Sequence, residues 1–213
     1  QVSTPVANAQ NFPVLTSSTT PSTNCAVGLE DGVAEILTVD GTAVGVATGY
    51  TYAWTGPVAP AFPVNNPTNN ANAARLIKLQ GGAGYDYTVI VTSQANGCQT
   101  PLQLNVVDAK TLPVITLAAT DNGICDPLLT VPAVVFNGTV TATVTNLVGV
   151  LTDYSFAFGA GMNAGVTTLN VYSQLNGGAT PYTSVATHTP TGCVSAQVST
   201  PVANAQNFPV LTS

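Results

Sequence analysis

Four cysteines are the residues in this sequence whose type and placement most clearly indicate chemistry. Cys25 and Cys125 each follow a proline-containing motif, and Cys98 and Cys193 each follow an Asn-Gly or Thr-Gly turn. No two of them have CxxC spacing and the chain has one histidine, so the pattern indicates disulfides rather than a zinc site. Disulfides persist in oxidising compartments, which predicts an extracellular, cell-surface protein.

Two other motifs resemble catalytic or phosphate-binding features, and both have a structural interpretation. His188 has no serine or cysteine partner in a motif such as GxSxG, so we expect a surface or strand residue. The run Gly81–Gly84 lacks the lysine and the helix start of a phosphate loop, and we expect it to connect two strands as a hairpin. No set of acid, base, metal ligand and nucleophile recurs in the chain, which predicts neither an enzyme nor a cofactor.

Four acidic residues near the first cysteine are the candidate ligands for a metal ion. Glu30, Asp31, Glu35 and Asp40 are close enough in sequence to gather around calcium, which prefers carboxylate oxygens. The matching part of the second half offers only Asp126, whereas a calcium site that stiffens a repeated protein should recur with the repeat. We therefore predict no metal site.

The two ends of the sequence are identical over seventeen residues. Gln1–Ser17 recurs without a change as Gln197–Ser213, at an offset of 196 residues. Identity this complete is typical of an array of near-identical units. We therefore expect one full period, followed by the beginning of the next.

A weaker repeat divides this period into two related domains. Val6–Thr16 matches Val106–Thr116 at an offset of 100, and Tyr50–Trp54 corresponds to Tyr154–Phe158. Domains of about 100 residues are of a common size for an independent core. The predicted divisions are residues 1–8 as the last strand of the preceding repeat, 9–108 and 109–204 as the two domains, and 205–213 as the start of the next repeat.

The repeat leaves several disulfide pairings open. Three pairings exist within the chain, and a fourth pattern joins Cys193 to the next copy of Cys25. We expect bonds within each domain, Cys25 with Cys98 and Cys125 with Cys193, so that each bond joins the start of a domain to its end. A bond between Cys98 and Cys125 would instead bridge the linker between the domains.

The pattern of β-branched and aromatic residues predicts short strands throughout, and no segment has a helical apolar period. Six or seven strands in about 100 residues indicate tandem immunoglobulin-like β-sandwiches. We expect the central core aromatic of each domain to be Trp54 and Phe158. The inter-domain linkers are marked by Pro13 and Pro113. The segment Pro57–Asn72 is predicted to be one long surface loop. The expected strands are Val33–Val39, Tyr50–Trp54, Arg75–Leu79, Tyr85–Ser93, Leu102–Val107, Val131–Phe136, Thr139–Thr145, Tyr154–Phe158, Thr167–Tyr172 and Tyr182–Thr187.

The composition excludes several classes of partner. Only 6% of the residues are charged, against roughly 25% in an ordinary soluble protein, and the net charge is −6. Arg75, Lys78 and Lys110 are the only basic side chains apart from the histidine, so nucleic acids and anionic membrane surfaces are unsuitable partners. No apolar run reaches the ~20 residues of a membrane span, so we expect no membrane insertion of the repeat.

Four motifs follow one another in the first half of the chain: Cys25-x-x-Gly28-x-x-Asp31-Gly32, Tyr50–Trp54, Tyr87–Thr92 and Asn96-Gly97-Cys98. Together they resemble the repeats of the giant cell-surface adhesins of gliding Bacteroidota, which carry arrays of Ig-like or PKD-like modules and are exported by type IX secretion. The resemblance implies surface display, adhesion and filament formation. Domain 2 is the more divergent, because it lacks the Gly and Asp-Gly that follow the first cysteine of domain 1.

We therefore expect the repeat unit of a long secreted filament or adhesin stalk that holds a distal binding region away from the cell. Its partners would be the adjacent identical repeats, and parallel copies of the chain if the low surface charge serves side-by-side packing into a cable. An alternative is a carbohydrate- or cell-binding module in which the repeats bind the target. Exposed aromatic residues in the loop 57–72 would favour the alternative, and Phe62 is the only one there.

Overall fold

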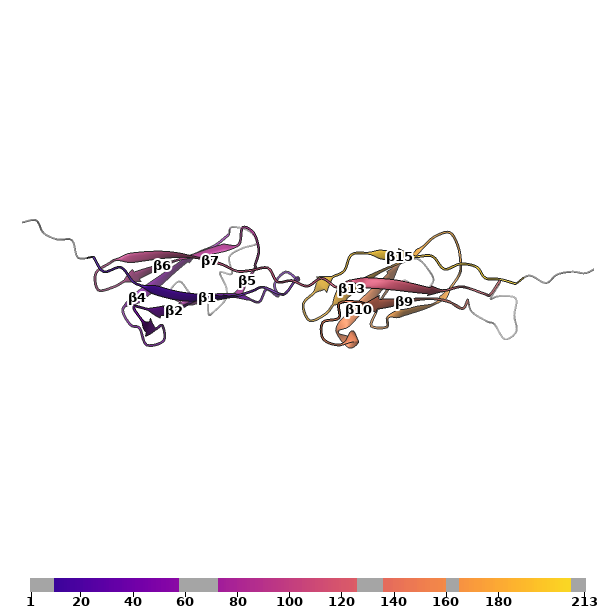
Figure 1. Ribbon diagram of the computed structural model, residues 1–213, viewed down its shortest axis with the longest axis horizontal. Helices are drawn as coiled ribbons and strands as arrows, with labels where there is room; N and C mark the ends of the chain where they lie inside the picture. Colours follow the sequence, from indigo (N-terminus) through magenta and orange to yellow (C-terminus); the bar gives the residue numbers. More distant parts are fainter. Residues whose placement is uncertain (1–9, 58–72, 126–135, 160–164, 208–213) are drawn as a thin grey trace, which may run out of the picture. The chain divides into compact units, whose positions relative to one another are not determined.

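The protein folds into two compact units of β-structure, Gln1–Lys110 and Thr111–Ser213. A computed structural model describes residues 10–57, 73–125, 136–159 and 165–207 (Figure 1). The only helical element in these ranges is η1, a 3₁₀ turn at Leu151–Asp153. None of the described helical structure has the length and apolarity needed to cross a membrane. The all-β prediction is confirmed.

Unit 1 is a sandwich of two antiparallel sheets (Figure 1). In one sheet β2 lies between β1 on one side and β3 and β5 on the other. In the second sheet β6 lies between β4 and β7. The strands are β1 (Leu15–Thr20), β2 (Gly32–Val39), β3 (Thr42–Ala43), β4 (Tyr50–Thr55), β5 (Arg75–Leu79), β6 (Asp86–Ser93) and β7 (Gln99–Asn105).

Unit 2 repeats this plan with some changes at the sheet edges. In one sheet β9 lies between β8 and β12. In the second, β10 pairs with β13, β11 lies outside β10, and β14 and β15 pair with β13. The strands are β8 (Ile115–Thr120), β9 (Gly138–Val144), β10 (Tyr154–Gly159), β11 (Gly165–Thr167), β12 (Val171–Leu175), β13 (Tyr182–His188), β14 (Cys193–Val194) and β15 (Val198–Thr200).

Side chains that alternate between apolar and polar types place one face of each sheet in a core. In β6 the side chains of Tyr87, Val89 and Val91 point inward and are nearly inaccessible to water, while their neighbours are partly exposed. In β10 the inward side chains are Tyr154, Phe156 and Phe158. Each unit has its own core cluster, so each sandwich is stabilised by its own apolar burial.

The strand order and one side-chain hydrogen bond are those of an immunoglobulin-like sandwich. The sheets β1-β2-β5 and β4-β6-β7 correspond to the A-B-E and C-F-G sheets of that fold. The hydroxyl of Tyr87, at the start of β6, donates to the carbonyl oxygen of Gln80 at 3.0 Å. Tyr182, at the start of β13, donates to Asn176 in the same way at 2.7 Å. Both bonds match the tyrosine corner of immunoglobulin-like domains.

The glycine run Gly81–Gly84 does not form the predicted hairpin. It follows β5 of one sheet and precedes β6 of the other, so it carries the chain across the sandwich. The reason is close backbone packing: a Cβ atom on Gly81 would overlap the carbonyl group of Val107, and the Gly82 amide donates to Val106 at 2.9 Å. Glycine is required because no larger residue permits this approach.

Most predicted strands are present, with differences at the segments that lack clear alternation. The predicted strand Thr167–Tyr172 is divided between β11 and β12, which belong to different sheets. The first strand of each unit, β1 and β8, was not among the predicted strands. Val131–Phe136 falls almost entirely, and the loop Pro57–Asn72 largely, outside the described residues.

Candidate functional site

The cysteines lie at the ends of the sandwiches, and each end is defined by the path of the chain. We call the end where the first strand of a unit begins its leading end, and the opposite end, where the chain leaves the unit, its trailing end. In unit 1 the segment before β1 contacts the turn between β6 and β7: Asn96 donates to the Asn11 carbonyl at 3.1 Å, and Thr100 donates to Pro13 at 2.7 Å. Cys98 belongs to this turn, so it lies at the leading end.

Cys25 lies at the trailing end of unit 1. The first strand β1 runs the length of the sandwich, and Ser22 then pairs with Asp108, just beyond β7. The Ser22 amide donates to Val107 at 2.9 Å, and the Ala109 amide donates to Ser22 at 2.8 Å. Cys25 follows three residues later, beside the segment through which the chain leaves the unit.

In unit 2 Cys193 lies at the leading end. The segment before β8 is held by Asn146, whose side chain accepts from the Val114 amide at 2.7 Å and donates to Leu112 at 2.9 Å. Cys193 pairs with His188, the last residue of β13, and His188 also pairs with Tyr154, the first residue of β10. The loop that contains Asn146 leads into β10, so Cys193 lies at the same end of the unit as this loop. Its side chain is fully buried.

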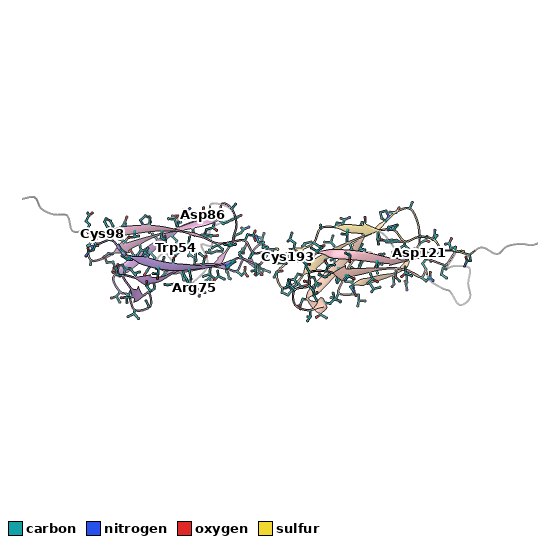
Figure 2. The ribbon with its side chains drawn as sticks, in the orientation of Figure 1. Trp54, Arg75, Asp86, Cys98, Asp121 and Cys193 are labelled. Carbon is teal, nitrogen blue, oxygen red and sulfur yellow. The ribbon has the colours of Figure 1, made fainter. Side chains whose placement is uncertain are left out.

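Cys125 lies at the trailing end of unit 2. Asn122 pairs there with Asn204, just as Ser22 pairs with Asp108 in unit 1. The side chain of Gln206, in the departing chain, donates to the carbonyl oxygen of Ile124 at 3.0 Å. Figure 2 shows Cys193 and Asp121, which precedes Asn122, at opposite ends of the unit.

This placement excludes the predicted pairing within domains. A disulfide requires Cα atoms within about 7 Å of one another. Cys98 and Cys25 are separated by the length of β7, whose seven residues span roughly 20 Å. Cys193 and Cys125 are likewise separated by the length of β13.

The bonding states of the four cysteines agree with this geometry. Cys25 and Cys193 are disulfide-bonded. Cys98 and Cys125 carry free thiols, and Cys125 is exposed. The predicted pairs Cys25 with Cys98 and Cys125 with Cys193 are therefore wrong, and a bond between Cys98 and Cys125 is excluded as well.

The two linker prolines belong to the folded leading ends. Pro13 and Pro113 each lie two residues before the first strand of their unit, and both are buried. The carbonyl oxygen of Pro13 accepts the hydroxyl of Thr100 at 2.7 Å. A proline here fixes the direction in which the chain arrives, because its φ angle is restricted.

Three of the four acidic residues considered as calcium ligands, Asp31, Glu35 and Asp40, accept hydrogen bonds from the protein. Asp31 accepts from the backbone amides of Thr23 at 2.7 Å and Asn24 at 3.2 Å, which fixes the segment before Cys25. In unit 2 Asn137 takes the corresponding role and accepts from the Gly123 amide at 2.8 Å. Because an amide replaces the carboxylate, this clamp serves the backbone and does not depend on charge.

The hydrogen bonds at Asp31 also determine its ionisation. Partial burial acts to raise the pKa of this carboxyl, but the bonds from Thr23, Asn24 and Ser22 favour the charged form and together lower the pKa below its ordinary value. A lowered folded-state pKa stabilises the fold above the unfolded pKa of about 3.9, and this contribution is lost as the pH falls through the folded value.

The other acidic candidates occupy separate places. Glu35 pairs with Arg75 at 3.2 Å and accepts from Ser18 at 3.0 Å, in the middle of a sheet. Asp40 accepts from the Tyr50 hydroxyl at 2.6 Å and from the Val14 amide at 2.8 Å, and these bonds lower its pKa. No group of three or more metal-ligating side chains occurs among the described residues.

The histidine and the core aromatics have structural contacts. His188 is buried in β13, its Nδ1 is 2.7 Å from the Thr191 hydroxyl, and its ring lies 4.9 Å from that of Tyr154. Phe158 is in the core as predicted, whereas Trp54 is only partly buried, and its indole donates to Ala73 at 2.7 Å. Trp54 packs against the core of unit 1 from this partly buried position, and Tyr52 on the same strand is the buried aromatic.

Sequence reasoning did not find the polar residues that organise the trailing ends. Ser22 and Asn122 are fully buried and join the first strand of each unit to the departing chain. They correspond at the same offset of 100 residues that relates Cys25 to Cys125, and that offset was the available signal.

No protein-family model matches the chain, and no curated protein is similar enough to count as a relative.

Proposed function

We propose that this chain is a structural repeat unit of a very long secreted filament or adhesin stalk, which extends a distal binding region from the cell surface. The observation that carries the proposal is the identity of Gln1–Ser17 and Gln197–Ser213. Two units of one fold lie between these identical segments.

The ends of the two units support this proposal. The chain leaves unit 2 through Asn204 and Gln206, and the sequence that follows is the one that leads into β1 of unit 1. A further copy of unit 1 after unit 2 would therefore meet the same kind of leading segment that unit 1 itself has. Such continuity is typical of repeat proteins, in which each unit contacts only its neighbours.

An extracellular location is supported by the bonded cysteines. Structural disulfides persist in oxidising surroundings and are rare in the cytosol. Of the 213 residues only twelve carry a formal charge, three basic and nine acidic, so solubility depends on threonine, serine and asparagine. This composition supports exposure outside the cell and offers no basic patch for nucleic acid.

The proposal is tested by length and location. Chains of one, two and four periods should increase in maximum dimension in proportion to the number of periods, as measured by small-angle X-ray scattering. Antibodies against the 213-residue chain should label filaments outside the cell by immunogold electron microscopy. Labelling confined to the cytoplasm, or compact particles whose dimension does not grow with period number, would contradict the proposal.

Side-by-side packing of several chains into a cable stays a prediction from the low charge. Sedimentation of a four-period chain at high concentration tests it. If chains assemble side by side, the measured mass should rise with concentration. A constant monomeric mass would refute the cable and leave a stalk made of a single chain.

A further inference from the structure

The bonded and the free cysteines follow one rule, in which the position of each cysteine within its unit decides its partner. We propose that every junction between consecutive units of the array carries one disulfide. The bond joins the trailing-end cysteine of one unit to the leading-end cysteine of the unit that follows. Cys25 thus bonds to Cys193, and Cys125 bonds to the Cys98 of the next period. The second bond rests on the proposed array.

The cysteines of the two units occupy equivalent positions. Cys25 and Cys125 both follow a first strand and a buried polar residue that pairs with the departing chain. Cys98 lies in the connection after β6, and Cys193, the first residue of β14, directly follows the connection after β13; β6 and β13 are the strands that carry the corner tyrosines. Each unit therefore presents one cysteine at each of its two ends.

The covalent chain limits the distance between the two ends that meet at a junction. The linker joins the trailing end of unit 1, at Asp108, to the leading end of unit 2, at Val114. Six residue steps separate these positions, so the ends are held within about 20 Å of one another even if the linker is extended. Cys25 and Cys193 lie at the two ends that the linker joins, which raises the local concentration of each for the other.

The bonding state of each cysteine follows its position in the chain. The two cysteines that lie at the junction within this chain are the two that are disulfide-bonded. The two free cysteines are Cys98, whose partner under the rule is in the preceding copy, and Cys125, whose partner is in the following copy. The chain after unit 2 has the sequence that precedes β1, so the second junction has the same two kinds of end.

Each bond forms by oxidation of two thiols. The cysteines lose two protons and two electrons, and the electrons reduce the disulfide of an oxidant to two thiols. The oxidant is of the disulfide class, either a thiol–disulfide oxidoreductase of the export route or a small disulfide such as oxidised glutathione. In the experiments below it is oxidised glutathione.

The first experiment uses the 213-residue chain. The oxidised protein is treated with iodoacetamide, digested with pepsin without reduction, and analysed by mass spectrometry. The expected result is one cross-linked species, in which the Cys25 peptide is joined to the Cys193 peptide, with Cys98 and Cys125 both alkylated. A link from Cys25 to Cys98, or alkylation of all four cysteines, would overturn the rule.

The second experiment counts free thiols in chains of increasing length. Each period has four cysteines, and the rule leaves only the first Cys98 and the last Cys125 without a partner. Monomeric chains of one, two and four periods should therefore all have two reactive thiols. If the period junctions are not bonded, the count rises in proportion to the number of periods; if bonds lie within domains, it is zero. Either result refutes the second bond.

Two matched variants of the two-period chain identify the bond directly. Cys125→Ser in the first period should raise the count from two to three, because it leaves the Cys98 of the second period unpaired. Cys98→Ser in the first period should lower the count to one, because that residue has no partner. Equal effects of the two substitutions would contradict the pairing.

Failure of this inference is distinguishable from failure of the proposed function. If cells display filaments whose period junctions contain only free thiols, the proposed stalk function stands and the bond between Cys125 and the next Cys98 is refuted. If a two-period protein has a bonded junction but the cells produce no extracellular filament, the pairing rule stands and the proposed stalk function is refuted.

Discussion

Individual residues differ between the two units in ways that isolate their contributions to stability. Tyr52 has a buried hydroxyl without a hydrogen-bond partner among the described residues, and the corresponding residue of unit 2 is Phe156. Ser184 likewise has a buried hydroxyl that no described residue partners, and the corresponding residue of unit 1 is Val89. Each unit thus shows that the polar atom of the other is dispensable for the fold, since a buried hydroxyl without a partner is unfavourable.

Ser184→Ala should therefore stabilise unit 2, by about 1 kcal/mol, because it removes an unsatisfied polar atom from the core. The matched control is Ser195→Ala. The Ser195 hydroxyl accepts from the Ala186 amide at 2.9 Å and donates to Ala196 at 2.8 Å, so its loss should destabilise unit 2 by about 1 kcal/mol. Calorimetric unfolding of both variants measures the difference, and equal effects would show that the two hydroxyls are equivalent.

Ionisation of the corner tyrosine, Tyr87, should lower the stability of unit 1 at alkaline pH. Burial raises the pKa of Tyr87 to about 12, whereas the unfolded value is about 10. The contribution of its neutral form is complete below pH 10 and is lost as the pH rises through 12. Tyr87→Phe should lower the free energy of unfolding by about 1 kcal/mol at pH 7, because Gln80 loses its donor, and this deficit should shrink above pH 10.

Fluorescence of Trp54 reports the unfolding of unit 1, because Trp54 is the only tryptophan of the chain and lies in that unit. Denaturant unfolding at pH 7, 10 and 11.5 should show the two proteins converging. Tyr182→Phe in unit 2 is the control and should leave the Trp54 transition unchanged. A difference between Tyr87→Phe and the parent that is constant with pH would contradict the assigned pKa.

At the scale of elements, the sequence was sufficient to predict strands that alternate between apolar and polar residues. The strands Gly32–Val39, Arg75–Leu79 and Tyr182–His188 were predicted to within one residue at each end. β1 was missed because it is an edge strand rich in serine and threonine, with only partly buried side chains. Gly81–Gly84 was misjudged because a change of sheet depends on packing against Val107, far away in sequence.

The glycine pair that follows β12 offers an internal comparison of close packing. A Cβ atom on Gly177 would lie 2.5 Å from the carbonyl oxygen of Ala203, closer than any real Cβ contact, whereas one on Gly178 would meet nothing within 4 Å. Gly177→Ala should destabilise unit 2 by about 2 kcal/mol or more, and Gly178→Ala should change little. Thermal unfolding measures both variants, and similar melting temperatures would contradict the packing.

At the scale of the whole molecule, the sequence predicted the cysteines as the chemically important residues but not their pairing. The pairing depends on which end of a sandwich each cysteine occupies. That in turn depends on the direction of the strands around it, and spacing along the chain contains no such information. The length of β7 between Cys98 and Cys25 is the physical reason that the expected bond cannot form.

The proposed bonds limit how far a filament can be stretched. Cys98 and Cys125 of one period are 27 residues apart, and the copy of Cys25 that follows Cys193 lies 28 residues further on, because the period is 196 residues. The shortest covalent path through an oxidised period therefore contains 27 residues, or about 92 Å, and through a reduced period 196 residues, or about 670 Å. Single-molecule pulling of a four-period chain should show about a sevenfold greater extension with reductant. Equal extensions in the two conditions would exclude bonded junctions.

The placement of the cysteines at the ends of the units also bears on how the chain withstands damage. Loops closed from each unit to the next overlap, so a broken peptide bond leaves its two sides attached through sulfur. Trypsin cleavage after Lys110, between the units, should leave the 21.5 kDa protein intact on a non-reducing gel and divide it into two fragments of similar size after reduction. Separate fragments without reductant would show that the units are held only by the backbone. In the proposed filament, a single protease cut at any point between the first and the last bonded cysteine would leave the two sides connected.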